Sequence, residues 1–336
     1  MTPVATTVEA QSIAAKHARR FDYLPVGLFG AVMGLTGLSV AWRLAAACYG
    51  LPPLIADAIG WIALATFLTL ALAYAAKAVT AWPSVLAEFR HPIAGNLFGT
   101  VFISLLLLPF ALQGLSPLVA AATWMLGAAG MLVFAFVIVG RWMGSRQQVA
   151  HATPAWIVPV VGLLDIPLAT PLLGLPYTGV LAMFSLSVGL FFAIPLFTLI
   201  FARLVFEEPL PPAQRPTLMI LMAPFAVGFS SYVATLGAID AFAEALFFIA
   251  LFVLIVLANR LRDLPRCCPF RVSWWAVSFP LAAVAVGGLR YAEHKRELPA
   301  DALALGLLAI ATATIAGLAA RTLLGIARNE LRELAS

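Results

Sequence analysis

The chain has 336 residues, of which 63% are hydrophobic and only 10% are charged, with a formal net charge of +5. Soluble domains carry about 25% charged residues, because their surface has to be polar. The composition therefore excludes an ordinary soluble protein or soluble enzyme and predicts an integral membrane protein.

The apolar residues fall into stretches that are long enough to cross a bilayer, which takes about 20 residues per helix. We expect a cytoplasmic N-terminal segment (1–20), a transmembrane domain (21–326) and a cytoplasmic C-terminal tail (327–336). Within the domain the pattern predicts ten helices, at residues 24–47, 54–79, 92–112, 117–141, 154–173, 176–202, 214–236, 239–259, 273–291 and 300–325.

The number of helices depends on how two long apolar runs are divided. Between His91 and Gly140 the chain contains no Asp, Glu, Lys or Arg. A single helix of that length would measure about 75 Å, whereas a hydrocarbon core is about 30 Å thick. The turn-forming residues at 113–117 therefore separate two helices, and those at 174–176 separate two more.

Lys and Arg are distributed unevenly between the two ends of these helices. Sixteen of the 20 basic residues lie on one side, and only Arg43, Arg290, Lys295 and Arg296 lie on the other. Cytoplasmic loops are enriched in Lys and Arg, so both termini are predicted to be cytoplasmic. The basic residues lie close to helix ends, which favours contact with the lipid bilayer over binding of nucleic acid.

Prolines are concentrated in the odd-numbered helices. Pro109, Pro167, Pro224 and Pro280 lie in the third, fifth, seventh and ninth helix. A proline frees a backbone carbonyl and kinks a helix, and freed backbone at membrane depth is tolerated when it is buried in protein or faces a wet cavity. We therefore expect the odd helices to form an inner ring, which the first helix joins through glycines such as Gly34. Gly and Pro are also common in membrane helices generally, which is the simpler explanation.

Asp165 is the one acidic residue well inside a predicted helix. A charge at that depth costs at least about 2.5 kcal/mol, so such residues are usually functional or paired. One interpretation is a proton-coupling site or a residue that lines a substrate pathway. The other is a cap on the helix that breaks at Pro167, with the carboxyl protonated or bonded to freed backbone. The sequence leaves both open.

The sequence contains no phosphate-binding loop, dinucleotide-binding glycine pattern, nucleophile elbow or cluster of metal ligands. We therefore predict no catalytic residues, no metal and no cofactor. The inner helices offer mainly Gly, Ser, Thr and Phe, which would bind ions weakly, as conduction requires. The same small residues also suit close packing between helices.

Phe279 lies between Ser278 and Pro280 in the ninth helix. A bulky aromatic side chain at a kink can close a narrow pore, because a hydrophobic constriction excludes water. Ordinary packing is the more frequent role of a phenylalanine in a membrane helix.

Two segments carry a resemblance to a known family: Glu88-Phe89-Arg90-His91-Pro92, and Trp274-Trp275-Ala276-Val277-Ser278-Phe279-Pro280-Leu281. From about Pro25 to the end of the tenth helix, the chain resembles the tellurite-resistance/dicarboxylate transporter family, which includes bacterial TehA and the plant guard-cell slow anion channels. The resemblance implies five helical hairpins with the odd helices lining a central pore, a homotrimer with one pore per protomer, and Phe279 as the gate. It fixes the substrate less well, because members serve as anion channels, carriers of malate-like acids and sulfite exporters.

The leading hypothesis is a phenylalanine-gated pathway for small inorganic or organic anions across a bacterial-type cytoplasmic membrane, driven by the membrane potential. The alternative is a proton-coupled carrier of C4-dicarboxylates or related acids with Asp165 as the protonation site, or export of tellurite or sulfite. A membrane-embedded enzyme or a partner subunit is a third class. An enzyme would need a buried cluster of titratable residues near Asp165.

Overall fold

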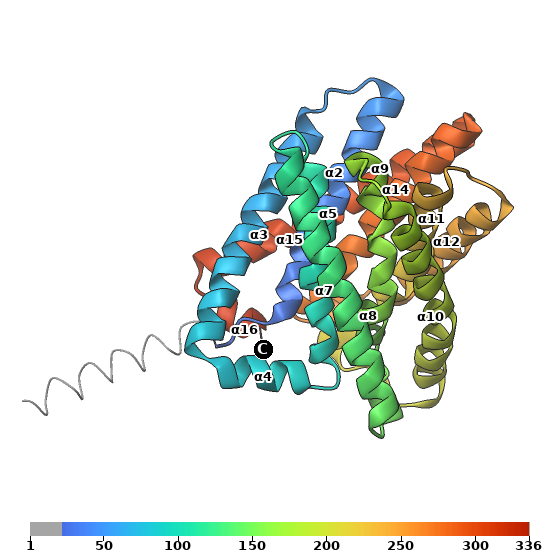
Figure 1. Cartoon of the computed structure of the whole chain (residues 1–336). Helices are drawn as coiled ribbons and strands as arrows, with labels where there is room; N and C mark the ends of the chain where they lie inside the picture. The colour runs from blue at the N-terminus through green and yellow to red at the C-terminus, as the bar shows by residue number, and fades with distance from the viewer. Residues whose placement is uncertain (1–21, 336) are drawn as a thin grey trace, which may run out of the picture.

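The computed structural model describes residues 22–335, apart from the side chains of Pro265 and Cys267. The predicted N-terminal segment 1–20 lies outside the described residues. The described chain is almost entirely helical and contains no strand (Figure 1). Ten of its helical stretches are long and apolar enough to cross a membrane. The prediction of an all-helical, multi-pass membrane protein with ten spans is confirmed.

We number the spans 1 to 10 in chain order. The even spans are continuous α-helices: α3 (Leu54–Thr80), α7 (Pro117–Gly144), α10 (Thr178–Phe206), α12 (Ala241–Leu261) and α15 (Leu298–Ala327). The odd spans are composite, and each begins with a turn or more of 3₁₀-helix. Span 1 is η1 (Val26–Phe29) and α2 (Gly30–Tyr49), and span 3 is η2 (Ala94–Phe98), α5 (Gly99–Leu107) and α6 (Pro109–Leu112).

The remaining odd spans follow the same plan. Span 5 is η4 (Pro154–Ile157), α8 (Val158–Val161), η5 (Gly162–Asp165), η6 (Pro167–Ala169) and α9 (Thr170–Leu173). Span 7 is η7 (Pro212–Met222) and α11 (Ala223–Leu236), and span 9 is η8 (Val272–Val277) and α14 (Ser278–Lys295). Four short helices lie between or after the spans: α4 (Trp82–Arg90), η3 (Val149–His151), α13 (Leu264–Cys267) and α16 (Leu331–Ala335).

The change from 3₁₀-helix to α-helix falls at a glycine or a proline in every odd span. Gly30 and Gly99 begin α2 and α5, and Pro159, Pro224 and Pro280 lie within the first three residues of α8, α11 and α14. Proline has no N–H to donate, so it is tolerated in the first turn of an α-helix, where that N–H has no partner in the helix. These residues therefore mark where the hydrogen-bonding pattern restarts.

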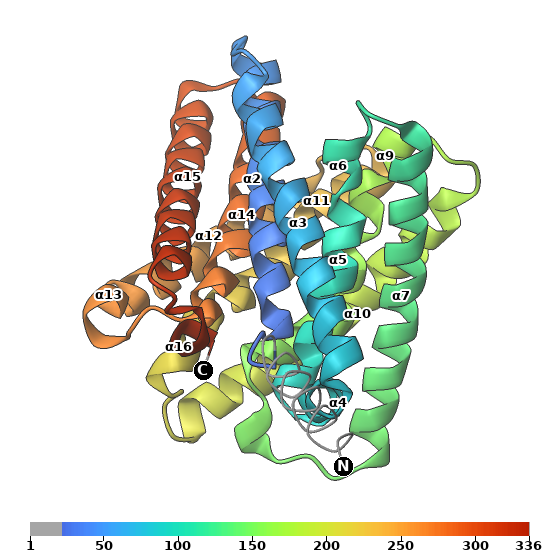
Figure 2. The same cartoon turned by 90° about the vertical axis from the view of Figure 1, so that its left-hand side faces the viewer.

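The odd spans form the inside of the bundle and the even spans form its outside. In the most apolar 18-residue window of each span, 67–83% of residues are buried in the odd spans but only 17–39% in the even spans. The odd spans contact one another in chain order, and α14 of span 9 packs on α2 of span 1, which closes the ring. Figure 2 shows α15, α3 and α7 as long helices on the outside of this ring.

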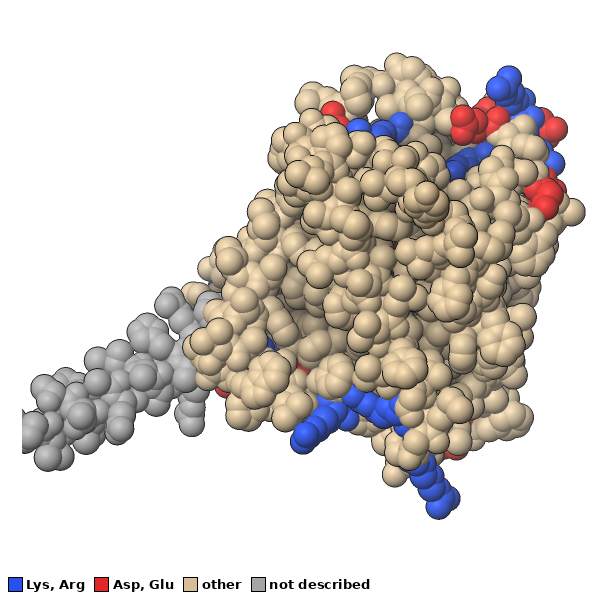
Figure 3. All heavy atoms as spheres, viewed as in Figure 1, with Lys and Arg blue, Asp and Glu red and all other residues tan. Residues whose placement is uncertain are grey.

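We call the end of the bundle at which the odd spans begin the start face, and the opposite end the far face. The start face is at the bottom of Figure 1, where α4 and α16 lie. Figure 3 shows a broad apolar flank between two charged ends, with Lys and Arg along the bottom and acidic and basic residues together at the top. This is the surface pattern of a protein that is surrounded by lipid.

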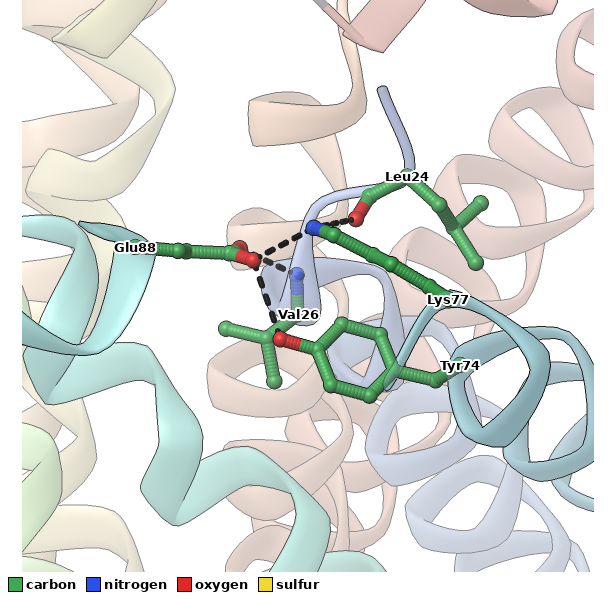
Figure 4. A network of polar contacts seen from close by, with 5 residues as sticks. All are labelled: Leu24, Val26, Tyr74, Lys77 and Glu88. Atoms are coloured by element: carbon green, nitrogen blue, oxygen red, sulfur yellow. Dashed lines mark hydrogen bonds and ion pairs between the residues drawn. The ribbon is translucent and has the colours of Figure 1, made fainter. Parts of the chain in front are cut away.

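A buried polar network at the start face holds the beginning of span 1 against α3 and α4 (Figure 4). Lys77 Nζ lies 2.7 Å from Glu88 Oε2 and donates to the carbonyl oxygen of Leu24 over 2.6 Å. Glu88 also accepts from the backbone N–H of Val26 over 2.7 Å and from the hydroxyl of Tyr74 over 2.9 Å. Because each charge has several partners, the network fixes the position at which η1 begins.

Candidate functional site

A cavity of about 440 Å³ enters the ring of odd spans from the start face. All five odd spans contribute side chains to its wall, and none of the described residues that line it belongs to an even span. The deeper wall is mostly apolar, with Met33, Ile103, Val161 and Ile220 among its residues. A space enclosed in this way would hold an ion only weakly.

Polar side chains gather near the mouth of this cavity, namely those of His91, Thr153, Gln214, Arg271 and Ser273. The short C-terminal helix α16 also reaches the mouth, where Leu334 and Ala335 line the cavity. It is attached there by a hydrogen bond of 2.7 Å from Arg271 Nη1 to the carbonyl oxygen of Glu333. The end of the chain therefore forms part of the mouth, which the sequence analysis did not predict.

The side chain of Phe279 stands between this cavity and a second one. The second cavity measures about 40 Å³ and is also lined by residues of all five odd spans. Phe279 and Val227 are the only described residues that line both cavities. The two spaces therefore follow each other along the inside of the ring, and these two side chains divide them.

The position of Phe279 is set by the contact between α14 and α2. Its side chain is 8% exposed, and a Cβ atom built on Gly37 would lie 3.5 Å from its Cδ2 atom. The preceding Ser278 donates from Oγ to the carbonyl oxygens of Trp275, over 2.6 Å, and Gly30, over 3.3 Å. The backbone of α2 therefore lies directly behind the phenylalanine ring.

Asp165 lines the first cavity from the 3₁₀-helix η5. Its side chain is 2% exposed, and Oδ1 has no hydrogen-bond partner. No side-chain bond caps the following helix η6, which begins at Pro167. These contacts match neither interpretation in full, so the role of Asp165 stays a prediction.

Among the other residues singled out from the sequence, Pro280 lines the first cavity beside Phe279. Pro109, Pro167 and Pro224 are buried and line neither cavity. They lie instead at the starts of α6, η6 and α11, where the helical hydrogen-bonding pattern restarts. These three prolines thus shape the ring without facing its interior.

Gly34 and Ser278 also line neither cavity. They face each other across the contact between α2 and α14, where a Cβ atom on Gly34 would overlap the side chain of Ser278. Their role in the structure is close helix packing, which small residues allow in membranes.

Arg290 was not predicted to be a site residue. From the sequence it was named only as one of the four basic residues on the less basic side of the membrane. Phe279, Ala283, Val286 and Arg290 all line the second cavity, at spacings of four, three and four residues. Residues with such spacing share one face of a helix, so the sequence did contain the signal that Arg290 lies on the same face of its helix as Phe279, about three turns closer to the far face. Groups of three or more His, Cys, Asp or Glu that could hold a metal are absent from the described part of the chain.

Comparison with known proteins gives relatives from plants and bacteria. The chain is 28% identical to the S-type anion channel SLAH3 of Arabidopsis thaliana over 94% of its length, and 27% identical to the guard cell S-type anion channel SLAC1 of the same plant over 89%. It spans only 51% and 55% of those two proteins.

The tellurite resistance protein TehA homolog of Haemophilus influenzae is 27% identical over 78% of the chain and 79% of its own length. The family model described as SLAC1, voltage-dependent anion channel, matches residues 23–323, which takes in nearly all of the ten spans. The resemblance noted from the two sequence motifs is thereby confirmed, and the chain belongs to the SLAC1 family of voltage-dependent anion channels.

Proposed function

We propose that this chain is a channel for small anions, and that the ring of Phe279 closes the passage. The position of Phe279 between two cavities that share the same five spans carries this proposal. A hydrophobic side chain in a narrow passage stops ions because it excludes the water that would solvate them. The relatives named as anion channels support the choice of anions.

In this proposal the start face is cytoplasmic and the membrane potential supplies the driving force. The orientation is supported by the excess of Lys and Arg in the loops at that end of the spans. An inside-negative potential contributes about 2.3 kcal/mol per charge per 100 mV, so it expels anions without further coupling.

The test is anion current through planar bilayers that contain the purified protein. We expect the wild type to conduct little and Phe279→Ala to conduct strongly, with little discrimination among small anions. Phe225→Ala is the matched control, since Phe225 lies on α11 and packs on Phe197 but lines neither cavity. Phe225→Ala should conduct as little anion current as the wild type. Equal currents from both variants, or none from Phe279→Ala, would refute the gate.

A second candidate function is proton-coupled transport of C4-dicarboxylates or related acids, or the export of tellurite or sulfite. The observation in its favour is the buried carboxyl of Asp165, which lines the first cavity with Oδ1 unbonded. Flux of malate into vesicles under a proton gradient, measured for the wild type and Asp165→Asn, separates the two candidates. A carrier loses its dependence on the proton gradient in the variant, whereas a channel keeps conducting.

We also propose that the protein is a homotrimer with one passage per protomer, on the family resemblance. The even spans expose many large apolar side chains, which lipid or neighbouring protomers would cover. Light scattering of the protein in detergent should give three times the chain mass of 35.7 kDa. A mass of one chain at the same concentration would contradict the trimer.

A further inference from the structure

Resting on the channel function proposed above, we propose that Ser230 and Arg290 form a binding site for one small inorganic anion, of the class of chloride, bromide or nitrate. The site lies in the second cavity, on the far-face side of Phe279.

Ser230 supplies the first argument. Its side chain lies on α11, is 4% exposed and lines the second cavity, yet its Oγ atom has no hydrogen-bond partner. Hydroxyls in helices can bond to the carbonyl four residues earlier, as Thr235 does with Ser231 in the same helix. Because the Ser230 hydroxyl lacks that bond and is shielded from solvent, its proton is left for a ligand in the cavity.

Arg290 supplies the second argument. It lines the same cavity, its Nε atom is buried without a hydrogen-bond partner, and it forms no ion pair with a described residue. Two other basic residues at the far face do have acidic partners: Arg43 pairs with Asp57 and Lys295 pairs with Glu244. Helical side chains lean toward the helix N-terminus, so Arg290 reaches back along α14 toward Phe279.

The chemistry of the second cavity selects for a small anion. Arg290 is the one charged residue among the described residues of its wall, which contains no carboxylate. Glu293 is close enough for its charge to act on Arg290, but no hydrogen bond or ion pair joins them. Arginine donates charge-assisted hydrogen bonds, and the serine hydroxyl adds a further donor, so the wall offers donors and repels cations.

The size of the second cavity points to an inorganic ion rather than an organic acid. A buried water needs about 10–15 Å³ of such space, so about 40 Å³ holds a single small ion or a few waters. The first cavity, at about 440 Å³, is large enough for a four-carbon acid, but the second is not. An anion that passes Phe279 would therefore shed most of its water and meet two fixed donors in its place.

Bromide binding to the purified full-length protein in detergent tests the site without any need for conduction. Bromide replaces gluconate at constant ionic strength, and the melting temperature is followed. We expect saturable stabilisation of the wild type, and a bromide Kd that is about tenfold weaker or more in Arg290→Gln, because a charged donor is lost. Ser230→Ala should weaken the Kd by a smaller factor. Arg296→Gln is the control, since Arg296 is an exposed base six residues further on that lines neither cavity.

The outcome that overturns the site is bromide stabilisation that is unchanged in both Arg290→Gln and Ser230→Ala. If Arg290→Gln proves too unstable to purify, Ser230→Ala alone decides, since it removes a single oxygen atom.

Reversal potentials in the Phe279→Ala background separate this site from the channel proposal. Adding Arg290→Gln should lower the permeability of chloride relative to potassium, and adding Arg296→Gln should not. If Phe279→Ala fails to conduct while bromide binding depends on both residues, the site stands and the channel proposal fails. If Phe279→Ala conducts while neither bromide binding nor selectivity responds to Arg290→Gln, the site fails and the channel proposal stands.

Discussion

Gly34 of α2 and Ser278 of α14 approach so closely that a Cβ atom on Gly34 would overlap the Oγ and Cβ atoms of Ser278. Gly34→Ala therefore forces the two helices apart or turns Ser278 away from the carbonyl oxygen of Gly30. Overpacking of this kind costs about 1–3 kcal/mol. We expect a clearly lower melting temperature of the purified protein in detergent.

The double variant Gly34→Ala with Ser278→Gly should recover much of this loss, because Ser278→Gly removes the two atoms that the added methyl group would overlap. Gly30→Ala is the control, since its added Cβ would lie 3.8 Å from the carbonyl oxygen of Trp275, an ordinary contact. If Gly34→Ala melts at the same temperature as Gly30→Ala, the close contact is not a feature of the protein in solution.

The ion pair of Lys77 and Glu88 allows a second prediction. Lys77→Met leaves Glu88 without its cationic partner in a largely buried site, where the loss of one partner costs about 3–5 kcal/mol. Lys77→Met with Glu88→Leu should cost less than the sum of the two single variants, since no unpaired charge remains. The free energy of unfolding by denaturant is measured for the wild type, the two single variants and the double variant.

Arg43→Met serves as the comparison for the buried pair, because Arg43 and Asp57 form a pair in which both side chains are more than 40% exposed. An exposed pair contributes about 0–1 kcal/mol, so this variant should be near the wild type. Similar losses for Lys77→Met and Arg43→Met would show that the network is not desolvated.

The number of spans and their boundaries were predictable because a bilayer requires long apolar runs, and short links with basic or turn-forming residues separate them. The breaks expected at 113–117 and 174–176 fall between observed helices, since α6 ends at Leu112, α7 begins at Pro117, α9 ends at Leu173 and α10 begins at Thr178. These features depend on local composition and turn chemistry, which a sequence displays directly.

The helices at the start face and the composition of the cavity walls were not predictable in the same way. The segment Trp82–Arg90 lies between the predicted helices 54–79 and 92–112, and no helix was predicted there. It forms α4, which is too short to span a membrane and in which Glu88 contacts α3 and span 1. The Glu88-to-Pro92 motif was recognised as a family feature, and only the three-dimensional contacts show that Glu88 fixes the backbone of Val26. Such pairings join residues far apart in sequence.

Asp240 gives a prediction for pH. It caps α12 by accepting from the N–H groups of Phe242 and Ala243, each over 3.0 Å, and it accepts from the hydroxyl of Tyr232 over 2.6 Å. The Tyr232 hydroxyl and the backbone donors hold the pKa of Asp240 below its ordinary value. The ionised carboxylate therefore stabilises the fold at pH values above the pKa of an Asp side chain in the unfolded chain, about 3.9. This stabilisation is lost as the pH falls through the lower pKa that Asp240 has in the folded protein.

The measurement is the difference in melting temperature between the wild type and Asp240→Asn. Asparagine also caps helices, so this variant removes the charge and keeps a capping side chain. We expect the wild type to be more stable at neutral pH, and the difference to shrink below about pH 4. In the Tyr232→Phe background the difference at neutral pH should be smaller. A gap that stays constant from neutral pH to pH 3 would contradict the role of the ionised carboxylate.

A new plug can be built one turn beyond the proposed gate. Ala283 follows Phe279 by four residues and lines the second cavity on the same face of α14. In the Phe279→Ala background, Ala283→Leu should lower the anion current by about tenfold or more, because a branched side chain in a cavity of about 40 Å³ again excludes water. Single-channel recording measures the effect.

Ala309→Leu adds the same atoms to an exposed position on α15, outside the ring, and should leave the current of Phe279→Ala unchanged. If Ala283→Leu conducts as well as its parent, ions do not pass through the second cavity, and the passage lies elsewhere in the protein.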